Sequence, residues 1–476
     1  MSGDTENKGK SPEDGKSGSQ ADGFRSEHDS LGEVRVPQQA LWAAQTQRAV
    51  NNFPMSLRRL PEAFIRAVLD IKKAAAQANQ NLEELDAGRA GAIIEAVDRL
   101  LNDDRLLDHF PVDIFQTGSG TSTNMNANEV IAHLANAGDH DAEVHPNDHV
   151  NRGQSSNDVI PSAIQISAAC YLHRHTLPAL THCIQVMNQR SEELRSVIKT
   201  GRTHLMDAMP VSLGQSLGAW AAQMADNRDR LNDMLGQLLA LPQGGTAVGT
   251  GINAHESFAE AFNETLGRNT GLPFRRADDL FSRIAAQDTA VALSGQLKTC
   301  AVSLMKIAND LRWMNSGPLA GLGEIQLEAL QPGSSIMPGK VNPVIPEAVA
   351  MASAQVIGND ATITVAGQSG NFELNVMLPV IADNLLYSLQ LVTNSCQLLA
   401  DRAIATFEVN HEQLEKALAS NPILVTALNP VIGYESAAKI AKQAYKEKRP
   451  VLDVAVEQTD MSRDELKALL DPAKLV

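Results

Sequence analysis

The sequence has few of the residues that support several common functions. The 476-residue chain contains four cysteines and no CxxC pair, and aromatic side chains make up only 4% of it. Acidic residues outnumber basic residues by 56 to 40, which gives a formal charge of −16. Widely spaced cysteines argue against an iron–sulfur cluster and predict reduced, buried thiols typical of the cytosol. So negative a chain is a poor candidate for binding nucleic acid or an anionic membrane.

The sequence also lacks long apolar runs. None reaches the roughly 18 residues needed to span a bilayer, and the N-terminus has no apolar core typical of a secretory signal. Residues 1–23 are polar and rich in glycine and serine. Such a segment cannot offset its ordering entropy by burial, so we expect a disordered tail. The reduced thiols and the lack of a secretory signal lead us to expect a cytoplasmic protein.

Long helical patterns dominate the rest of the chain. Gly/Pro-rich breakers separate five segments, at about 158–200, 210–241, 274–315, 346–366 and 374–409. A forty-residue helix is about 60 Å long, which exceeds the width of a small domain. The segment 374–409 is apolar on most faces, which is typical of a helix buried all round. The sequence therefore predicts an all-α protein whose long central helices also pack against other subunits.

This pattern divides the chain into four parts. A region with shorter helical patterns precedes the long helices. A smaller helical region follows them, with a capping box at Ser462 and Glu465. We expect a tail at 1–23, a mostly helical domain at 24–157, a central long-helix bundle at 158–409 and a small C-terminal helical domain at 410–476.

Five polar stretches interrupt the helices. Each lies at a helix end, where unpaired N–H groups and a partial positive charge favour anions. Serine, threonine and asparagine can bind a carboxylate without burying many charges. A cap and a turn would explain one such stretch, but five together predict a site for a small, doubly charged, oxygen-rich anion. The stretches are TGSGTSTNMN (117–126), HPNDHVNRGQSSND (145–158), GRTHLMDAMP (201–210), GGTAVGTGIN (244–253) and GSSIMPGKVNP (333–343).

The last of these stretches is not a nucleotide-binding loop. Five residues separate Gly333 from Gly339, where a Walker A loop has four. Val341 follows Lys340, at the position where serine or threonine would coordinate magnesium. Lys340 is therefore the lone cation of a loop that serves another ligand.

Few titratable residues lie in the polar stretches. His204 lies between two predicted helices, where it could equally be an interhelical hydrogen-bonding histidine. Glu347 follows Pro346 in a first helical turn, where an acid ordinarily compensates the helix dipole. A glutamate that hydrogen-bonds a histidine would instead raise its basicity and orient it. Ser334 and its neighbour lie in a loop free to close, or in a flexible surface turn.

A metal site is not expected. The segment YLHRHTLPALTHC contains His173, His175, His182 and Cys183. On a helix, residues two apart point to nearly opposite sides, and Pro178 interrupts the pattern. Solvated helix histidines explain this segment better than zinc ligands.

The polar stretches resemble the motifs of the fumarase/aspartase superfamily, which includes argininosuccinate lyase and adenylosuccinate lyase. The resemblance covers nearly the whole chain after the tail and is closest to class II fumarases, through TGSGTxxNMN, HPNDxVN, QSSND, GRTHLMDAxP, GGTAVGTGxN and GSSIMPGKVNP. It implies the all-α superfamily fold in a homotetramer, with long helices from four subunits and active sites shared among three chains. It also implies reversible hydration of fumarate to (S)-malate in the tricarboxylic acid cycle, without metal or organic cofactor.

The resemblance also implies roles for individual residues. Ser334 would remove the C3 proton of malate, and His204, polarised by Glu347, would handle the hydroxyl through a water molecule. An aci-carboxylate dianion would be the intermediate, with Lys340 suited to its extra charge. The residues implied to bind substrate are Ser119, Thr121, Ser155, Ser156, Asn157, Thr203, Ser335, Lys340 and Asn342. A secondary dicarboxylate site would comprise His145, Pro146, Asn147 and Asp148.

Two positions depart from the class II pattern, and two other functions remain open. His149 stands where many fumarases have aspartate, and Ser216 stands where glutamate is usual. Aspartate ammonia-lyase shares the signature loop, but aspartases typically have TQ where this chain has Thr203-His204, and AGAGT where it has TGSGT. An inactive helical scaffold would be expected to have lost the polar stretches. Ser119 and His204 thus favour water over ammonia chemistry.

Overall fold

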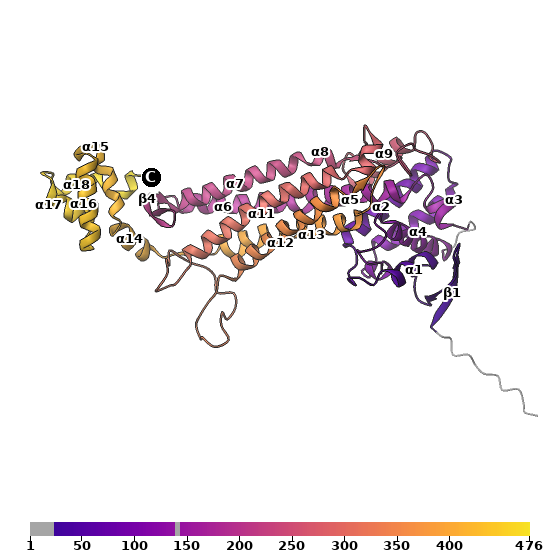
Figure 1. Cartoon of the computed structure of the whole chain (residues 1–476), viewed down its shortest axis with the longest axis horizontal. Coiled ribbons are helices and arrows are strands. Elements are labelled where there is room, and N and C mark those ends of the chain that lie inside the picture. Colours follow the sequence, from indigo (N-terminus) through magenta and orange to yellow (C-terminus); the bar gives the residue numbers. More distant parts are fainter. Residues whose placement is uncertain (1–22, 139–142) are drawn as a thin grey trace, which may run out of the picture.

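The computed structural model describes residues 23–138 and 143–476. The predicted tail, apart from Gly23, lies outside these ranges. The molecule is elongated, with an N-terminal region at one end, a bundle of long helices, and a C-terminal region at the other end (Figure 1). Helices dominate, and the named strands form only two-stranded pairs. The predicted all-α class is confirmed.

The N-terminal region opens with a β-hairpin and continues as helices. Strands β1 and β2 pair from Phe24↔Pro37 to Asp29↔Gly32, although the sequence predicted mostly helix here. Helix α2 buries Ile65, Val68 and Ala75 on one face. The elements are β1 (Phe24–Asp29), β2 (Gly32–Pro37), α1 (Ala44–Asn52), α2 (Glu62–Asn81), α3 (Ala87–Leu101), η1 (Leu106–His109), α4 (Thr121–Asn136) and the π-helical turn η2 (Pro146–Val150).

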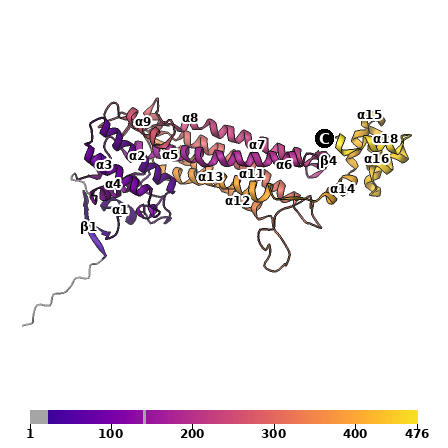
Figure 2. The ribbon, with the colours of Figure 1, turned by 180° about the vertical axis from the view of Figure 1, so that it is seen from behind.

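The central region contains the long helices of the bundle. Residues Ser156 to Glu193 run as one helical stretch through a π-helical turn, from the N-terminal region toward the far end (Figures 1 and 2). The first elements of the central region are α5 (Ser156–Tyr171), η3 (Leu172–Thr176), α6 (Leu177–Glu193), β3 (Ile198–Thr203), β4 (Met206–Ser212), α7 (Leu213–Asp233), α8 (Leu235–Leu238) and β5 (Ala240–Leu241). The first predicted helix, 158–200, therefore ends earlier than expected, because strand β3 follows.

The stretch 201–210 is a hairpin rather than a loop between two helices. Strands β3 and β4 pair from Ile198↔Ser212 to Thr203↔Met206. His204 and Leu205 form the tip, with φ of 56° and 61°. Positive φ at both central residues is the geometry of a type I′ hairpin turn, whose twist matches that of the strands. This geometry makes His204 the outermost point of the hairpin.

The next segment returns to the N-terminal end before the bundle resumes. Helix α9 packs on α2, and β5 pairs with β6 in parallel, which brings residues 244–253 back beside the N-terminal region. The remaining elements are α9 (Phe258–Thr270), β6 (Arg275–Arg276), α10 (Leu280–Ala285), α11 (Asp288–Met314), β7 (Ile325–Gln326), α12 (Val344–Gly367), β8 (Gly370–Asn371), β9 (Leu374–Asn375), α13 (Leu378–Leu399) and η4 (Ala400–Ile404). The predicted helix 274–315 is thus two helices, α10 and α11.

One hydrophobic core runs through the N-terminal region and the bundle, from Leu60 to Phe407. Near its centre, Cys183, Cys300 and Cys396 are buried on α6, α11 and α13. Hydrogen bonds with Cys183 and Cys300, together with burial, raise the pKa of the Cys396 thiol. All four cysteines are free, as expected. Cysteines distant in sequence therefore converge as protonated thiols inside the bundle.

The C-terminal region has its own small core. Leu424, Val425, Ile440, Val454 and Leu466 are among its buried members. The predicted capping box at Ser462 and Glu465 is present. The elements are β10 (Glu408–Val409), α14 (His411–Ala419), η5 (Pro422–Leu428), α15 (Asn429–Ile432), α16 (Tyr434–Glu447), α17 (Val451–Gln458), α18 (Arg463–Leu469) and η6 (Pro472–Lys474).

The four-part division of the chain stays a prediction. Within the described ranges, every helix is too short or too polar to cross a membrane.

Candidate functional site

The five polar stretches fall into two groups at opposite ends of the bundle. Residues 117–126, 145–158 and 244–253 lie at the N-terminal end, and residues 201–210 and 333–343 lie at the far end (Figure 1). The helical stretch from Ser156 to Glu193 separates the groups. At 1.5 Å per residue, a helix over this range is roughly 55 Å long. One chain therefore cannot bring both groups to one small ligand.

At the N-terminal end, the first turns of two sixteen-residue helices meet. Gly120 caps α4 with φ of 73°, and a Cβ at this residue would lie 2.9 Å from the side chain of Ile160 on α5. Only glycine fits both the conformation and the close contact. The Oγ of Ser119 and the Oγ1 of Thr121 are 2.8 Å apart. The predicted substrate-binding residues Ser119 and Thr121 thus lie where two helix N-termini converge.

The first turn of α5 connects to the third polar stretch. Ser155 forms a capping box with Asp158, whose carboxylate accepts hydrogen bonds from the N–H of Ser155, Gly244 and Thr246 at 2.9 to 3.0 Å. Asp158 is buried, and burial raises its pKa to about 6 while these N–H groups oppose the rise. The amide of Asn157 donates to the carbonyl of Ala247 at 2.8 Å. Partly buried hydrogen bonds therefore hold Ser155 and Asn157 in place.

Sequence reasoning missed Lys72, which lies behind these residues. It is 0% exposed, and its Nζ donates to the side-chain oxygens of Asn124, Asn151 and Gln154. The signal was available, since Lys72 occupies the buried stripe of α2 with Val68. A lysine at a core position of an amphipathic helix indicates a buried polar site.

At the far end, the tip of the β3–β4 hairpin is exposed. Thr203, His204 and Leu205 are all exposed, and Leu205 is 64% exposed. The base of the hairpin is held firmly: buried Glu324 contacts Lys199 Nζ at 2.8 Å and Arg202 Nη1 at 2.6 Å. The two strands therefore present His204 rigidly, with no hydrogen-bond partner for its side chain within the described chain.

The loop 333–343 is closed at its neck and extends from the bundle (Figure 1). The amide of Asn342 donates to the carbonyl of Gly333 at 2.5 Å, and Lys340 Nζ donates to Asn342 Oδ1 at 2.5 Å. Ser334 Oγ accepts hydrogen bonds from the N–H of Met337 at 2.9 Å and Ile336 at 3.3 Å. The loop thus places Ser334, Ser335, Lys340 and Asn342 on one compact unit.

Glu347 lies on the first turn of α12, next to this loop. It lines a cavity of about 410 Å³ together with Lys340, Asn342 and Arg312. No hydrogen bond joins Glu347 to His204 within the chain, although the sequence predicted that the two side chains interact. The described chain therefore does not show the predicted His204–Glu347 contact.

The predicted secondary site is an exposed π-helical turn. His145 Nδ1 lies 3.2 Å from a carboxylate oxygen of Asp148, and the His145 N–H donates to His149 Nδ1 at 2.8 Å. Pro146 begins the turn and Asn147 is exposed. Burial is the largest cause that lowers the pKa of His149. The turn exposes the His145 side chain to solvent, while His149 Nδ1 already accepts a hydrogen bond within the turn.

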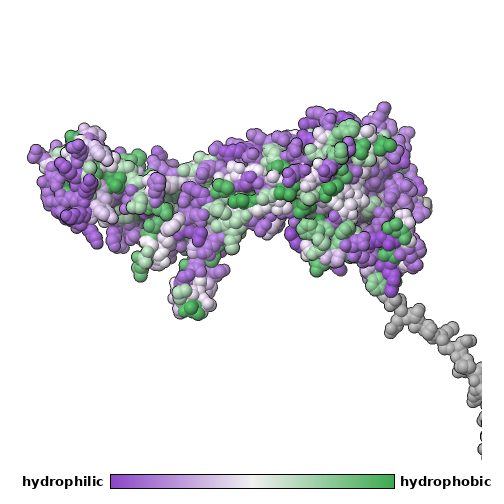
Figure 3. Space-filling view, viewed as in Figure 1, coloured by the Kyte–Doolittle hydropathy of each residue, from purple (hydrophilic) through white to green (hydrophobic). Residues whose placement is uncertain are grey.

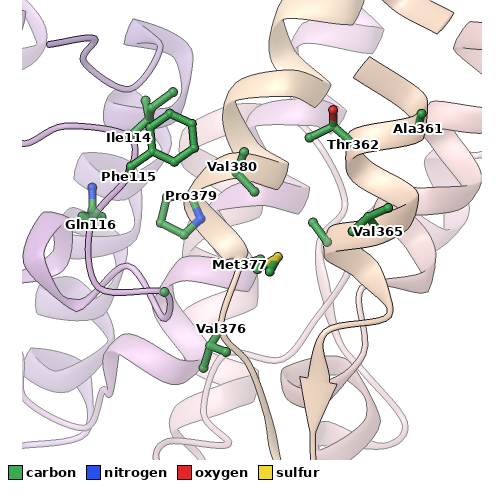
Figure 4. Close-up of a pocket in the computed structure, with 12 residues that line it drawn as sticks. Ile114, Phe115, Gln116, Ala361, Thr362, Val365, Val376, Met377, Pro379 and Val380 are labelled. Atoms are coloured by element: carbon green, nitrogen blue, oxygen red, sulfur yellow. The ribbon is translucent and has the colours of Figure 1, made fainter. Parts of the chain in front are cut away.

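A larger cleft of about 550 Å³ lies beside the first polar stretch, but its chemistry does not suit a dicarboxylate. Its lining is mainly apolar: Phe115 from the N-terminal region faces Pro379 and Val380 of α13, with Val365 of α12 opposite (Figure 4). No charged side chain lines it. We therefore place the candidate site on the polar stretches and not in this cleft.

The histidine-rich segment does not assemble a metal site. His182 Nε2 lies 2.6 Å from a carboxylate oxygen of Asp401, and the His175 ring contacts the Tyr171 ring at 4.9 Å. Within residues 23–138 and 143–476, no group of three or more potential metal ligands occurs.

Comparisons with known proteins agree with these motifs. Residues 32–358 match the lyase family model, and residues 424–476 match the fumarase C C-terminus model. A class II fumarate hydratase of Pseudomonas aeruginosa is 64% identical over 95% of this chain and 98% of its own. One from Xylella fastidiosa is 58% identical over 96% of each chain. The crystal structure of a class II fumarase from Schistosoma mansoni superposes with a TM-score of 0.91 at 36% identity, covering 95% of this chain and 99% of that one.

Proposed function

The chain belongs to the lyase family and, within it, to the class II fumarate hydratases, and we propose on this premise a mechanism built from its two groups of polar residues. The protein catalyses the reversible hydration of fumarate to (S)-malate. The N-terminal group holds the carboxylates, and the far group carries the proton transfers. The residue roles that follow are proposals supported by the geometry of this chain.

The observation that carries this proposal is the separation of the two groups by roughly 55 Å of helix. A substrate of four carbons can contact both groups only if different chains supply them. We propose a homotetramer in which each site draws on three chains. Apolar side chains exposed on the bundle support this assembly (Figure 3), among them Val302, Met351, Val365, Tyr387 and Leu398. Size exclusion with light scattering should give four times the 51.1 kDa chain mass.

Ser334 is the proposed base that removes the C3 proton of malate. A serine hydroxyl is a weak base, and its alkoxide must be stabilised to act as one. The N–H groups of Ile336 and Met337, which already point at Ser334 Oγ, would hold that negative charge in the manner of an oxyanion hole. Closure of the loop over substrate would exclude water and strengthen these hydrogen bonds.

The C3 proton leaves its bonding electrons on carbon, and these delocalise into the adjacent carboxylate as an aci-carboxylate dianion. Lys340 and the N-terminal turns of α4 and α5 would stabilise the added charge. Thr121, Asn157 and Asn342 would orient the two carboxylates by donating hydrogen bonds. Collapse of the dianion then expels the C2 hydroxyl as water and leaves the double bond of fumarate.

His204 is the proposed group on the hydroxyl side. As imidazolium it would give a proton to the departing hydroxyl, directly or through a water molecule, and in the hydration direction it would take one back. Glu347 of a different chain would orient the imidazole and raise its basicity. The exposed tip of the β3–β4 hairpin and the half-buried position of Glu347 allow such a contact between chains.

Absorbance at the fumarate band tests the activity most directly. We expect fumarate to form from malate without ammonium, and no measurable fumarate from L-aspartate. Efficient deamination of aspartate would favour the aspartate ammonia-lyase alternative, and a folded tetramer inert toward both substrates would favour an inactive scaffold. Activity unaffected by chelators would agree with a mechanism that uses side chains alone.

Two further proposals concern binding and location. We propose the turn from His145 to Asp148 as a secondary dicarboxylate site, supported by its exposed histidine, and calorimetry with malate on a His145→Ala variant tests it. A cytoplasmic location is supported by the free thiols.

A further inference from the structure

Lys72 is the most deeply buried cation in the described chain, and its environment is unusual. Its ammonium group lies 2.7 Å from Asn124 Oδ1, 3.0 Å from Asn151 Oδ1 and 3.0 Å from Gln154 Oε1. Among the described residues, no carboxylate forms an ion pair with it. Burial lowers the pKa of Lys72 to about 7, and the charge of Asp158 opposes this shift.

The contacts of Lys72 require its charged form. Three oxygens each accept one hydrogen bond from Nζ, and only an ammonium carries three N–H donors. The orientations of the amides are fixed by their other ends. The NH₂ of Asn124 donates to Ser156 Oγ, that of Asn151 to the Gln154 carbonyl, and that of Gln154 to the Val150 carbonyl. A buried positive charge is therefore solvated by neutral amides alone.

Asn124 transmits this charge toward the site. Its Oδ1 accepts from Lys72 at 2.7 Å, and its Nδ2 donates to Ser156 Oγ at 3.1 Å. A cation at the oxygen polarises the amide and makes its N–H a stronger donor. Because Ser156 Oγ accepts this hydrogen bond, its own O–H is left to donate elsewhere. Ser156 is half-buried on the first turn of α5, beside Asn157.

The negative charge of Asp158 does not contact Lys72 directly, so it does not remove the polarisation of the Asn124 amide. Asp158 is buried, but its carboxylate is satisfied by the N–H groups of Ser155, Gly244 and Thr246. The amides around Lys72 and the N–H groups around Asp158 hold the two charges in separate hydrogen-bonded shells. The arrangement thus directs a hydrogen-bond donor, backed by the Lys72 ammonium group, toward the face where α4 and α5 converge.

We propose that Lys72 is a positioning residue of the substrate site: through Asn124 it turns the Ser156 hydroxyl outward to donate to a carboxylate of the bound dicarboxylate. This inference rests on the proposed function, because it assumes that Ser156 contacts substrate. Lys72 itself does not touch substrate. Its role is to set the direction and donor strength of the hydroxyl that does.

The test uses Asn124→Asp in the full-length protein. A carboxylate at this position still accepts from Lys72 but cannot donate to Ser156, so the serine hydroxyl would turn inward and donate to it. We expect the dissociation constant of succinate, a non-reacting dicarboxylate, to rise by roughly tenfold or more, the scale of one charge-assisted hydrogen bond. The KM for malate should rise with it, with kcat changed much less.

Asn128→Asp is the matched control. Asn128 lies one turn further along α4, donates to the same Asn151 oxygen at 3.2 Å, and does not contact Ser156. The Asn128→Asp substitution adds the same charge to α4 but keeps the hydrogen bonds from Lys72 to Asn124 and from Asn124 to Ser156. We expect its succinate affinity to stay within about threefold of the parent, well short of the charge-assisted bond lost in Asn124→Asp.

A double-mutant cycle with Ser156→Ala separates positioning from mere stability. If Lys72 acts through Ser156, Asn124→Asp should cause no further loss of succinate affinity once the hydroxyl is gone. Additive losses, or an Asn124→Asp variant that binds succinate as tightly as the parent, would overturn the inference. A parent that binds succinate through Ser156 yet does not hydrate fumarate would instead overturn the proposed function and leave this inference intact. Lys72→Met should reproduce the loss of affinity if that variant folds.

Discussion

The two ends of the bundle hold their polar residues in opposite ways. At the N-terminal end, Asn124 and Asp158 are buried and hydrogen-bonded to residues of other segments, and Ser119 is buried with its hydroxyl 2.8 Å from that of Thr121. At the far end, His204 and Lys340 stand on an exposed hairpin tip and an exposed loop. Carboxylate binding requires donors fixed in advance, whereas a proton-transfer loop must admit substrate and then close. This difference supports the proposal of a preformed binding half and a catalytic half that is completed by other chains.

At the far end, hydrogen bonds and ion pairs nonetheless hold the base of the β3–β4 hairpin and the neck of the loop 333–343. Glu324 fixes the base of the β3–β4 hairpin through Lys199 and Arg202, and its N–H donates to the carbonyl of Met314 at the end of α11. The neck of the loop is closed by Asn342 and Gly333. Movement should therefore be confined to the loop itself, while the hairpin presents His204 as a rigid unit.

The largest effect should come from the catalytic half. Ser334→Ala should leave a folded tetramer and lower kcat by at least about 100-fold, the lower range of a general base's contribution. Ser335→Ala is the matched control, since no backbone N–H donates to its hydroxyl, and it should cost less. Steady-state absorbance with malate measures both variants. A Ser334→Ala enzyme with most of its kcat would remove this serine from the mechanism.

His204→Gln tests the hydroxyl side of the same half. Glutamine hydrogen-bonds but does not titrate near neutrality, so hydration should fall by about 100-fold with the fold intact. The variant should not deaminate aspartate, because Ser119 and its neighbours still fit the hydroxyl acid. Near-parent hydration would overturn the role of His204 while leaving the family assignment unaffected.

Mixing two inactive variants tests whether the two halves come from different chains. One chain carries Ser334→Ala, and the other carries Thr121→Val with Ser156→Ala. The two variants are mixed in equal amounts, unfolded and refolded together. If the two groups of a site come from different subunits, each group is intact in half of the cases. About a quarter of the sites should then have both groups intact. Each variant refolded alone is the control. Absence of recovered activity in correctly sized tetramers would place both halves in one chain.

A smaller effect is expected at Asp70, on the same helix as Lys72. Burial raises the pKa of Asp70 to about 6, against the attraction of Arg174, Lys73 and Arg66. Since the folded-state pKa exceeds the unfolded value of about 3.9, folding favours the protonated acid. This contribution to stability is full below about pH 4 and is lost as the pH rises through about 6.

Asp70→Asn should therefore stabilise the protein more at pH 8 than at pH 4. The difference should be on the order of 3 kcal/mol, because the pKa differs by about two units and one unit corresponds to about 1.4 kcal/mol. Chemical denaturation of parent and variant at the two pH values measures it. An equal effect at both would show that Asp70 titrates in the folded protein as it does in the unfolded chain.

The smallest effect should come from removing residues 1–23. This segment has too few apolar side chains to dock on either half, so neither tetramer mass nor turnover should change. Light scattering and steady-state kinetics on the truncated chain measure both. A large loss of activity would show that the segment contributes to a site or an interface.

The sequence alone was sufficient to predict a bundle of long helices and to identify the polar stretches that interrupt them. Capping chemistry identified the start of α18 at Ser462. The sequence did not reveal the β3–β4 hairpin, because two short strands that include Gly201 and Pro210 carry little alternation. Lys72 was missed because a lysine beside a second lysine at 73 reads as part of a solvated face.

The sequence determined which residues are candidates for the chemistry, since hydroxyl, amide and titratable groups are fixed by residue type and their clustering is visible along the chain. Only the tertiary structure decided how they are divided. Ser156 and His204 are both polar residues near helix ends, and nothing local distinguishes their environments. A continuous helical stretch, through the rise of its backbone, places one in a buried network beside Lys72 and the other on an exposed tip at the opposite end. Distance along a helix accumulates over many residues, so no single motif records it.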